Sequence, residues 1–318
     1  MEESGEKQRV CVTGAGGYVA SWVVKLLLSK GYMVHGTVRD PSDETKNGHL
    51  KKLENAVENL QLFKADLLDY EGLCAAVAGC TGLLHVASPV PYQRVELLEP
   101  AVTGTKNVLN ACLKAKIKKV VVVSSVAAVY MNPNWPTDRA MDESCWTDIE
   151  YCKGIENWYC VSKTMAEAEA LGYTKRSELN VVTVCPPIII GPMLQSTLNA
   201  SSLFLLNYMK DKGNTVEDID YGIVDVRDTA EAILLAYENP EAEGRYICSS
   251  YMVRTRDLVE KLKRMFPNYN YPQSFTEAKD NLKLTSEKLQ KLGWNYRPLE
   301  ETIVDAVTNY EESGLFSH

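Results

Sequence analysis

Short apolar runs alternate with amphipathic stretches over the first 185 residues of the chain. The runs that predict β-strands are Arg9–Thr13, Tyr32–Val38, Leu60–Lys64, Leu83–Val86, Lys119–Ser124 and Val181–Val184. Helical periodicity lies between several of them, up to Lys30, over Lys106–Lys114 and from Tyr159 through Ala168. Nearly all-apolar strands that alternate with helices are typical of a parallel sheet covered on both faces. We therefore predict an α/β fold built on a Rossmann-type, doubly wound parallel sheet.

The alternation breaks after Pro186-Pro187, where most segments are irregular in pattern. The elements predicted beyond this point are a helix that opens at Asp225 and runs through Ala236, with Asp228 as its N-cap, a strand at Tyr246–Cys248, and helices at Ser286–Leu292 and Glu300–Tyr310. We assign residues 1–185 and 218–250 to a dinucleotide-binding Rossmann domain. Residues 186–217 and 251–318 would form a smaller, mostly helical substrate-binding domain.

Composition narrows the class of partner. The 318 residues carry a formal net charge of −8, which argues against nucleic acid or an anionic membrane as the main partner. No apolar stretch has the length of a membrane span, and the N-terminus is too polar for a secretory signal. The nine cysteines match neither a zinc pattern nor a secreted disulfide framework. We expect reduced thiols, no metal and a cytoplasmic location.

A glycine-rich turn follows the first predicted strand and precedes the first helix. Glycines permit a tight turn there, and the free N–H groups at the helix start favour an anionic ligand. Such turns are also common for packing reasons alone, so the position after the first strand decides the interpretation. We expect a dinucleotide pyrophosphate to be bound by Thr13, Gly14, Gly16, Gly17, Tyr18 and Val19.

The residue after the second strand distinguishes NADH from NADPH. An acid at this place holds the ribose hydroxyls, whereas an arginine accommodates a 2′-phosphate. Arg39 stands here, with Lys46 a short loop later, and so predicts NADPH; a solvated pair of surface charges is the alternative. Topology adds contacts after the third and fourth strands, namely Asp66 and Leu67 at the adenine edge and Ala87, Ser88 and Pro89 beside the ribose and pyrophosphate.

Tyr159 and Lys163 are the candidate catalytic pair. They stand four residues apart, so their side chains share one face of a helix. An ammonium beside a phenol stabilises the phenolate and makes the phenol a better proton donor. Tyr208 and Lys212 have the same spacing, but no serine-ended strand precedes them, and we interpret Tyr208 as packing or surface. With a strand-end hydroxyl such as Ser125 to hold the substrate oxygen, the pattern indicates carbonyl reduction by a nicotinamide cofactor.

Several local signatures resemble the extended short-chain dehydrogenase/reductases, in particular the plant cinnamoyl-CoA reductase and dihydroflavonol reductase branch. The resemblance spans nearly the whole chain. Its motifs are Thr37-Val38-Arg39-Asp40-Pro41, His85-Val86-Ala87-Ser88-Pro89-Val90, Ser124-Ser125-Val126-Ala127-Ala128-Val129-Tyr130-Met131, Asp142-Glu143-Ser144-Cys145-Trp146, and Leu292-Gly293-Trp294 followed by Pro298.

The resemblance implies roles for individual residues. Ser125, Tyr159 and Lys163 correspond to the family's catalytic triad, and Lys163 also to its nicotinamide-ribose contact. Ser125 is preferred to Ser124 because the family's serine is the second of the pair, and Ser124 is assigned to the cofactor site. Pro186 and Ile189 fall where the family contacts the nicotinamide. We expect Val126, Tyr130, Met193 and Phe204 to line the substrate site.

Departures from the family pattern bear on the substrate. Val161-Ser162 replaces the Tyr-Gly of cinnamoyl-CoA reductases, as in dihydroflavonol reductases. Phe204, Asn207 and Thr255 stand where those enzymes place a His, a Lys and an Arg for the CoA portion, although arginines flank Thr255. Loss of such contacts weakens capture of a phosphorylated thioester. Cys152 and Cys160 match a family cysteine pair that can form a disulfide, and unlinked small residues are the equal alternative.

Our leading hypothesis is therefore an NADPH-dependent reductase of a small aromatic aldehyde or ketone, similar to the cinnamyl-alcohol-dehydrogenase-like members of lignin biosynthesis. The alternative is reduction of hydroxycinnamoyl-CoA thioesters. Three other functions are less favoured: a dihydroflavonol-type ketone reductase, a nucleotide-sugar epimerase and a non-catalytic NADPH-binding regulator. Arg39 argues against the epimerase, and the complete set of Ser125, Tyr159 and Lys163 argues against the regulator. Monomer and homodimer both fit the sequence.

Overall fold

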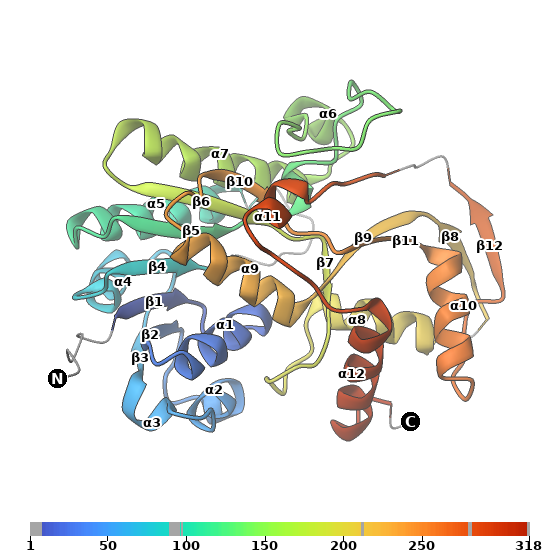
Figure 1. The fold of residues 1–318 in the computed structure, drawn as a ribbon, viewed down its shortest axis with the longest axis horizontal. Helices are drawn as coiled ribbons and strands as arrows, with labels where there is room; N and C mark the ends of the chain where they lie inside the picture. The colour runs from blue at the N-terminus through green and yellow to red at the C-terminus, as the bar shows by residue number, and fades with distance from the viewer. Residues whose placement is uncertain (1–7, 89–95, 97, 211–212, 279–281, 317–318) are drawn as a thin grey trace.

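A single parallel sheet of seven strands organises the computed structural model, which describes residues 8–88, 96, 98–210, 213–278 and 282–316 (Figure 1). The strand order is β10-β6-β5-β4-β1-β2-β3. The strands are β1 Arg9–Thr13, β2 Met33–Val38, β3 Leu60–Lys64, β4 Gly82–His85, β5 Lys119–Val123, β6 Asn180–Cys185 and β10 Gly244–Ile247. Every pair in this sheet is parallel. The predicted fold class is confirmed, and every predicted strand is present.

Helices cover both faces of the sheet. On one face α1 (Tyr18–Ser29) packs against α9 (Val226–Glu238), and on the other α5 (Leu98–Lys114) lies between α4 (Tyr70–Val77) and α7 (Trp158–Arg176) (Figure 1). Successive residues of a strand face opposite layers. Val121 of β5 accordingly joins the core beneath α1 and α9, whereas Val120 and Val122 join the core beneath α4, α5 and α7. This double burial explains why the strands are apolar throughout.

Smaller elements lie beside the large sheet, mostly in the C-terminal part that we expected to be largely irregular. Three strands pair in the order β11-β9-β7, and two more as β12-β8. The strands are β7 Ile188–Ile190, β8 Thr215–Asp218, β9 Asp220–Asp225, β11 Tyr251–Arg254 and β12 Ser274–Glu277. The remaining helices are α2 Glu44–Lys51, α3 Ala56–Asn59, α6 Ile149–Gly154, α8 Ala200–Met209, α10 Thr255–Met265, α11 Glu287–Lys291, α12 Leu299–Glu312 and the 3₁₀ turn η2 Val126–Ala128.

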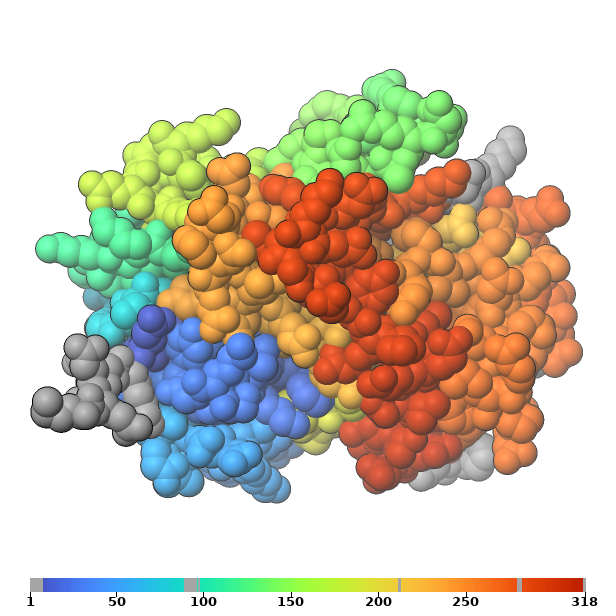
Figure 2. Space-filling model, in the orientation of Figure 1, coloured from blue at the N-terminus to red at the C-terminus, as the bar shows by residue number. Residues whose placement is uncertain are grey.

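The N-cap of α9 is Asp225, so the predicted cap at Asp228 is wrong. The Asp225 carboxylate accepts a hydrogen bond from the backbone N–H of Arg227 at 2.7 Å. Asp228 lies inside the first turn, where its carboxylate accepts from the backbone N–H of Arg297 at 2.8 Å and pairs with the guanidinium of that residue. The indole N–H of Trp294 donates to the carbonyl of Asp228 at 2.9 Å. The C-terminal segment therefore uses Asp228 as its anchor, and Figure 2 shows that segment in red against the orange surface of α9.

The return of β10 to the large sheet places a late segment of the chain in the Rossmann layer. β9, which directly precedes α9, belongs instead to the three-stranded sheet. The chain thus crosses between the two sheets more than once. The division into residues 1–185 with 218–250, and 186–217 with 251–318, stays a prediction.

Composition led us to expect reduced thiols, no metal site and no membrane span. All nine cysteines are free, and eight of them are buried. Within the described ranges, no group of three or more His, Cys, Asp or Glu side chains is arranged to hold a metal ion. No helix among the described residues combines the length and the apolar character that a membrane span needs.

Candidate active site

The glycine-rich turn lies at the carboxyl edge of the sheet, between β1 and α1. Gly14 has φ +66°, and a Cβ added to it would lie 2.9 Å from the Cβ of Ala87, so only glycine fits. The Thr13 hydroxyl accepts from the N–H groups of Val86 and Ala87 at 3.1 and 3.0 Å, which fastens the turn to the end of β4. Gly17 caps α1 without a side-chain hydrogen bond. Within the described part of the chain, the first N–H groups of α1 therefore receive no side-chain cap from Gly17, which suits a phosphate cradle.

Arg39 follows β2 beside this turn. Its side chain is exposed, and among the described residues it has no ion-pair partner. Lys46, by contrast, pairs with Asp43 at 3.2 Å. The Asn47 carboxamide oxygen lies 2.7 Å from where a Cβ on Gly16 would stand, so α2 closes directly on the glycine turn. This arrangement fits a bound dinucleotide whose ribose lies beside the Arg39 guanidinium.

Other predicted cofactor residues differ in what their side chains do. The Tyr18 hydroxyl donates to the carbonyl of Gly191 at 2.9 Å, so this side chain binds the segment after β7. Val19 packs against the main core, Ile189 is buried within it, and Asp66 is exposed. The Pro186 carbonyl accepts from the N–H of Val126 at 3.0 Å and so ties the end of β6 to η2. Pro89 lies outside the described residues.

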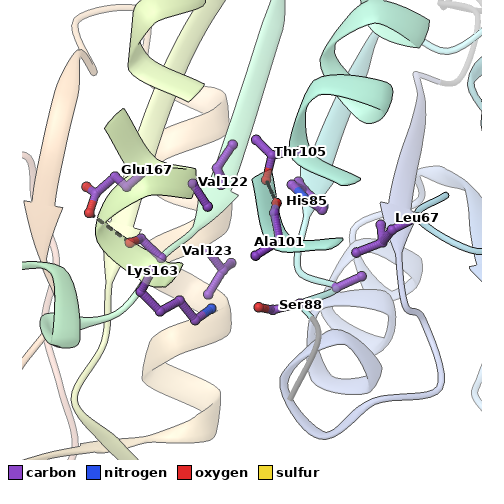
Figure 3. A pocket seen from close by; sticks show the side chains of 12 residues that line it. Leu67, His85, Ser88, Ala101, Thr105, Val122, Val123, Lys163 and Glu167 are labelled. Carbon is purple, nitrogen blue, oxygen red and sulfur yellow. Dashed lines mark hydrogen bonds between the residues drawn. The ribbon is translucent and has the colours of Figure 1, made fainter. Parts of the chain in front are cut away.

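A pocket lies at the carboxyl ends of β4 and β5, between α5 and α7 (Figure 3). Its lining includes five predicted site residues, Leu67, Ala87, Ser88, Ser124 and Lys163. In Figure 3 the Lys163 amino group and the Ser88 hydroxyl point toward each other across the pocket. The structure thus brings the predicted contacts of three strand ends and one helix to one place.

The predicted catalytic residues come from two elements that pack together, η2 and α7. Ser125 is the N-cap of η2, and its hydroxyl accepts from the N–H of Ala127 at 3.1 Å. Tyr159 stands in the first turn of α7 and packs on the cluster that contains Ala127, Cys160 and Val161. Lys163 is one turn further along, and both side chains are partly exposed. A substrate oxygen near this junction would meet a hydroxyl and a phenol.

His85 is a buried residue of this site that our sequence reasoning did not assign a role. Its Nδ1 lies 2.8 Å from the Thr13 hydroxyl oxygen, which already accepts two backbone N–H groups. The hydroxyl proton is therefore left to donate to Nδ1, and the imidazole carries its proton on Nε2. Burial, and secondarily the positive charge of Lys163, lowers the pKa of His85 to about 3. His85 is thus a neutral support for the glycine turn.

Glu167 also lines the pocket and was missed. It follows Lys163 by four residues, so the same helical spacing that linked Tyr159 to Lys163 would have found it.

The four predicted substrate residues do not share the pocket of Figure 3. Val126 and Met193 are 8% and 6% exposed and belong to the core. Tyr130 is partly buried beside Cys160, 3.9 Å from oxygen to sulfur. Phe204 meets the rings of Tyr208 and Tyr221 edge-on. The Tyr208 ring therefore packs as predicted, and Lys212 lies outside the described residues.

Cys152 and Cys160 are buried, free thiols of one small cluster. Burial raises the pKa of both, to about 12 for Cys160, which keeps them in the unreactive thiol form. A disulfide between Cys152 and Cys160 stays a hypothesis.

Residues 10–248 match the model of the family described as the NAD dependent epimerase/dehydratase family. The chain belongs to this family. It is 45% identical over 309 residues to cinnamoyl-CoA reductase 2 of Arabidopsis thaliana, which covers 96% of this chain and 93% of that protein. The relatives are reductases, so the chain is an oxidoreductase that acts on a carbonyl group, and the predicted membership of the extended short-chain dehydrogenase/reductases is confirmed.

Solved structures agree with this membership. Vestitone reductase from alfalfa superposes with a TM-score of 0.85 at 31% identity, covering 97% of this chain and 99% of that one. The yeast methylglyoxal/isovaleraldehyde reductase Gre2, solved with NADPH, gives a TM-score of 0.83 at 26% identity over 96% and 99% of the chains.

The depressed pKa of His85 predicts a pH dependence of stability. The folded protein binds this proton near pH 3 and the unfolded chain near the ordinary value of 6.5, so between these values the unfolded state binds more protons. Stability contributed by His85 is therefore full above pH 6.5 and falls as the pH is lowered, by up to about 1.4 kcal/mol per pH unit.

Urea unfolding of the wild type and of His85→Asn at pH 7.5, 6 and 5 measures this. We expect the stability advantage of the wild type to shrink as the pH falls, and a constant difference would contradict the assignment.

Proposed function

We propose that this protein uses NADPH to reduce the thioester carbonyl of a hydroxycinnamoyl-CoA to the aldehyde. The observation that carries the proposal is the junction of η2 with α7, which holds Ser125, Tyr159 and Lys163 at the carboxyl edge of the sheet. Relatedness to cinnamoyl-CoA reductases over nearly the full length of both chains supports this substrate class above the aldehyde that the sequence alone favoured.

The residues of the glycine turn and of β2 fit NADPH. The start of α1, which has no side-chain cap from Gly17, and the close approach at Gly14 suit the pyrophosphate. The exposed Arg39, which pairs with no acid among the described residues, suits a 2′-phosphate. NADPH, when bound, supplies the hydride for the carbonyl carbon. Lys163 and Ser88, which face each other across the pocket, would bind near the nicotinamide ribose.

The chain's own residues handle the oxygen and its proton. The Ser125 hydroxyl holds the carbonyl oxygen, and the Tyr159 phenol donates its proton to that oxygen as the carbon is reduced. Lys163 stabilises the phenolate that remains. With a thioester, the carbon–sulfur bond then breaks, so that one thioester, one NADPH and one proton give one aldehyde, one CoA thiol and one NADP⁺.

Reduction of a free aryl aldehyde or ketone is the second candidate, and the surroundings of Thr255 favour it. The Thr255 hydroxyl is fully buried and exchanges hydrogen bonds with the backbone of Ile219. The flanking Arg254 and Arg256 both pair with Asp218, at 3.1 and 3.3 Å. Cations already neutralised in this way offer less attraction to the phosphates of CoA.

The state of the cysteines bears on the cellular location of the protein. Free cysteines fit a reducing compartment, so we propose a cytoplasmic location, and a small aromatic carbonyl compound is the proposed partner.

The role of Tyr159 predicts a separation of binding from turnover. Tyr159→Phe removes only the proton donor, so we expect kcat to fall by about 10² to 10⁴ while the Kd for NADPH changes by less than about twofold. Tyr208→Phe is the matched control, because the Tyr208 ring packs edge-on against Phe204 and does not line the pocket of Figure 3. Full activity of Tyr159→Phe would rule out the mechanism.

The exposed guanidinium of Arg39 predicts the choice of cofactor. Arg39→Ala should raise the KM for NADPH by about 10- to 100-fold and leave the KM for NADH nearly unchanged. Lys52→Ala, an exposed cation at the end of α2, serves as the control. Equal use of NADH and NADPH by the wild type would show that Arg39 does not select the cofactor.

A substrate panel tests the proposed reaction. Feruloyl-CoA, coniferaldehyde and a dihydroflavonol are compared at equal concentrations, with NADPH absorbance and free thiol followed together. We expect oxidation of NADPH with feruloyl-CoA and release of one thiol per NADPH. If NADPH is oxidised with coniferaldehyde and not with feruloyl-CoA, the second candidate, reduction of a free aldehyde, is established instead.

A further inference from the structure

A buried carboxylate lies one helical turn beyond Lys163. Glu167 is 1% exposed, and its two oxygens accept hydrogen bonds from three elements of the sheet. The Ser124 hydroxyl donates at 2.8 Å from the end of β5, and the Thr183 hydroxyl at 2.6 Å from β6. Arg245 of β10 donates through Nε at 2.8 Å and through a terminal nitrogen at 3.2 Å. Glu167 therefore joins α7 to three strands at once.

Arg245 extends this connection to the loop that precedes α6. One terminal nitrogen donates to the carbonyls of Glu143 and Cys145 at 3.1 and 2.6 Å, and the other donates to the carbonyl of Ala128 at 3.0 Å. Together with the two bonds to Glu167, these use all five N–H groups of the guanidinium. The guanidinium also lies 3.6 Å from the centre of the Trp146 ring. The Asp142-Glu143-Ser144-Cys145-Trp146 motif thus wraps around Arg245.

The network adjoins the proposed catalytic residues in two places. Glu167 is on the same face of α7 as Lys163, and Ser124 directly precedes Ser125. Ser125, which follows the end of β5, has extended backbone, φ −162° and ψ 154°, and its hydroxyl accepts from the N–H of Ala127 at 3.1 Å. The bond from Ser124 to Glu167 therefore restrains the backbone from which the Ser125 hydroxyl is presented.

We propose that Glu167, held by Arg245, is a positioning residue that sets the place of Ser125 relative to Tyr159 and Lys163. The proposal rests on the catalytic roles given above to those three residues. Burying a charged pair costs desolvation, and an apolar pair of the same size would pack as well. Only directional hydrogen bonds, however, fix the rotation of the Ser124-Ser125 segment against the helix. A site that must align a hydroxyl and a phenol on one oxygen needs that orientation.

The test removes one donor at a time, because loss of Glu167 itself would leave Arg245 buried without its partner. Ser124→Ala and Thr183→Val each delete a hydroxyl that donates to Glu167, and both positions are buried. They differ in one respect, since only Ser124 adjoins the catalytic serine. The full-length chain is assayed with NADPH and its best substrate, and melting temperature, kcat and the KM for NADPH are measured for each variant.

We expect Ser124→Ala to lower kcat by about tenfold or more, with the KM for NADPH changed by less than about twofold. Thr183→Val should lower the melting temperature by a similar amount and keep kcat within about twofold of the wild type. An unchanged kcat in Ser124→Ala, or kcat losses in the two variants that only follow their losses of melting temperature, would overturn the proposal. So would a loss confined to the KM for NADPH, because it would make Ser124 a direct cofactor contact.

Ser125→Ala and Tyr159→Phe are measured in parallel. If both keep full activity, the catalytic assignment itself has failed. If both lose activity while Ser124→Ala keeps it, only the positioning role of Glu167 has failed.

Discussion

The carboxyl ends of parallel strands meet at one edge of a sheet, and the whole site depends on this constraint. The glycine turn after β1, Arg39 after β2, Ala87 and Ser88 after β4, and Ser125 after β5 come together although they are far apart in sequence. Local contacts then fix the edge. The Thr13 hydroxyl binds the backbone after β4, and the Pro186 carbonyl binds the start of η2. The fold itself therefore assembles the site.

Buried polar side chains add hydrogen bonds that hold the site in place. The neutral imidazole of His85 accepts the Thr13 hydroxyl, and the Glu167–Arg245 pair joins α7 to β5, β6 and β10. His85 and Glu167 line the same pocket as Lys163, so this proposed catalytic side chain stands beside buried, hydrogen-bonded polar groups. Among the described residues Arg39 has no ion-pair partner, whereas Arg254 and Arg256 both pair with Asp218.

The sequence predicted the large sheet well because its signals are local. The apolar run Lys119–Ser124 and the four-residue spacing of Tyr159 and Lys163 need no tertiary information. The α9 cap could not be read in this way, because Asp225 and Asp228 both precede the same apolar pattern. Only the arrival of Arg297, far along the chain, shows why Asp228 is buried in the first turn. Arg245 and Glu167 are likewise 78 positions apart. The small strands β7 and β9 pair Ile188 with Ile223, across a shorter separation in sequence, but their short segments carry no periodic signal.

A crystal structure of the protein with NADP⁺ tests the central claim most directly. The account predicts the Tyr159 hydroxyl beside the nicotinamide ring, the Lys163 amino group within about 3 Å of a nicotinamide-ribose hydroxyl, and the 2′-phosphate on the Arg39 guanidinium. A phenol turned away from the ring, or a 2′-phosphate bound elsewhere, would contradict it.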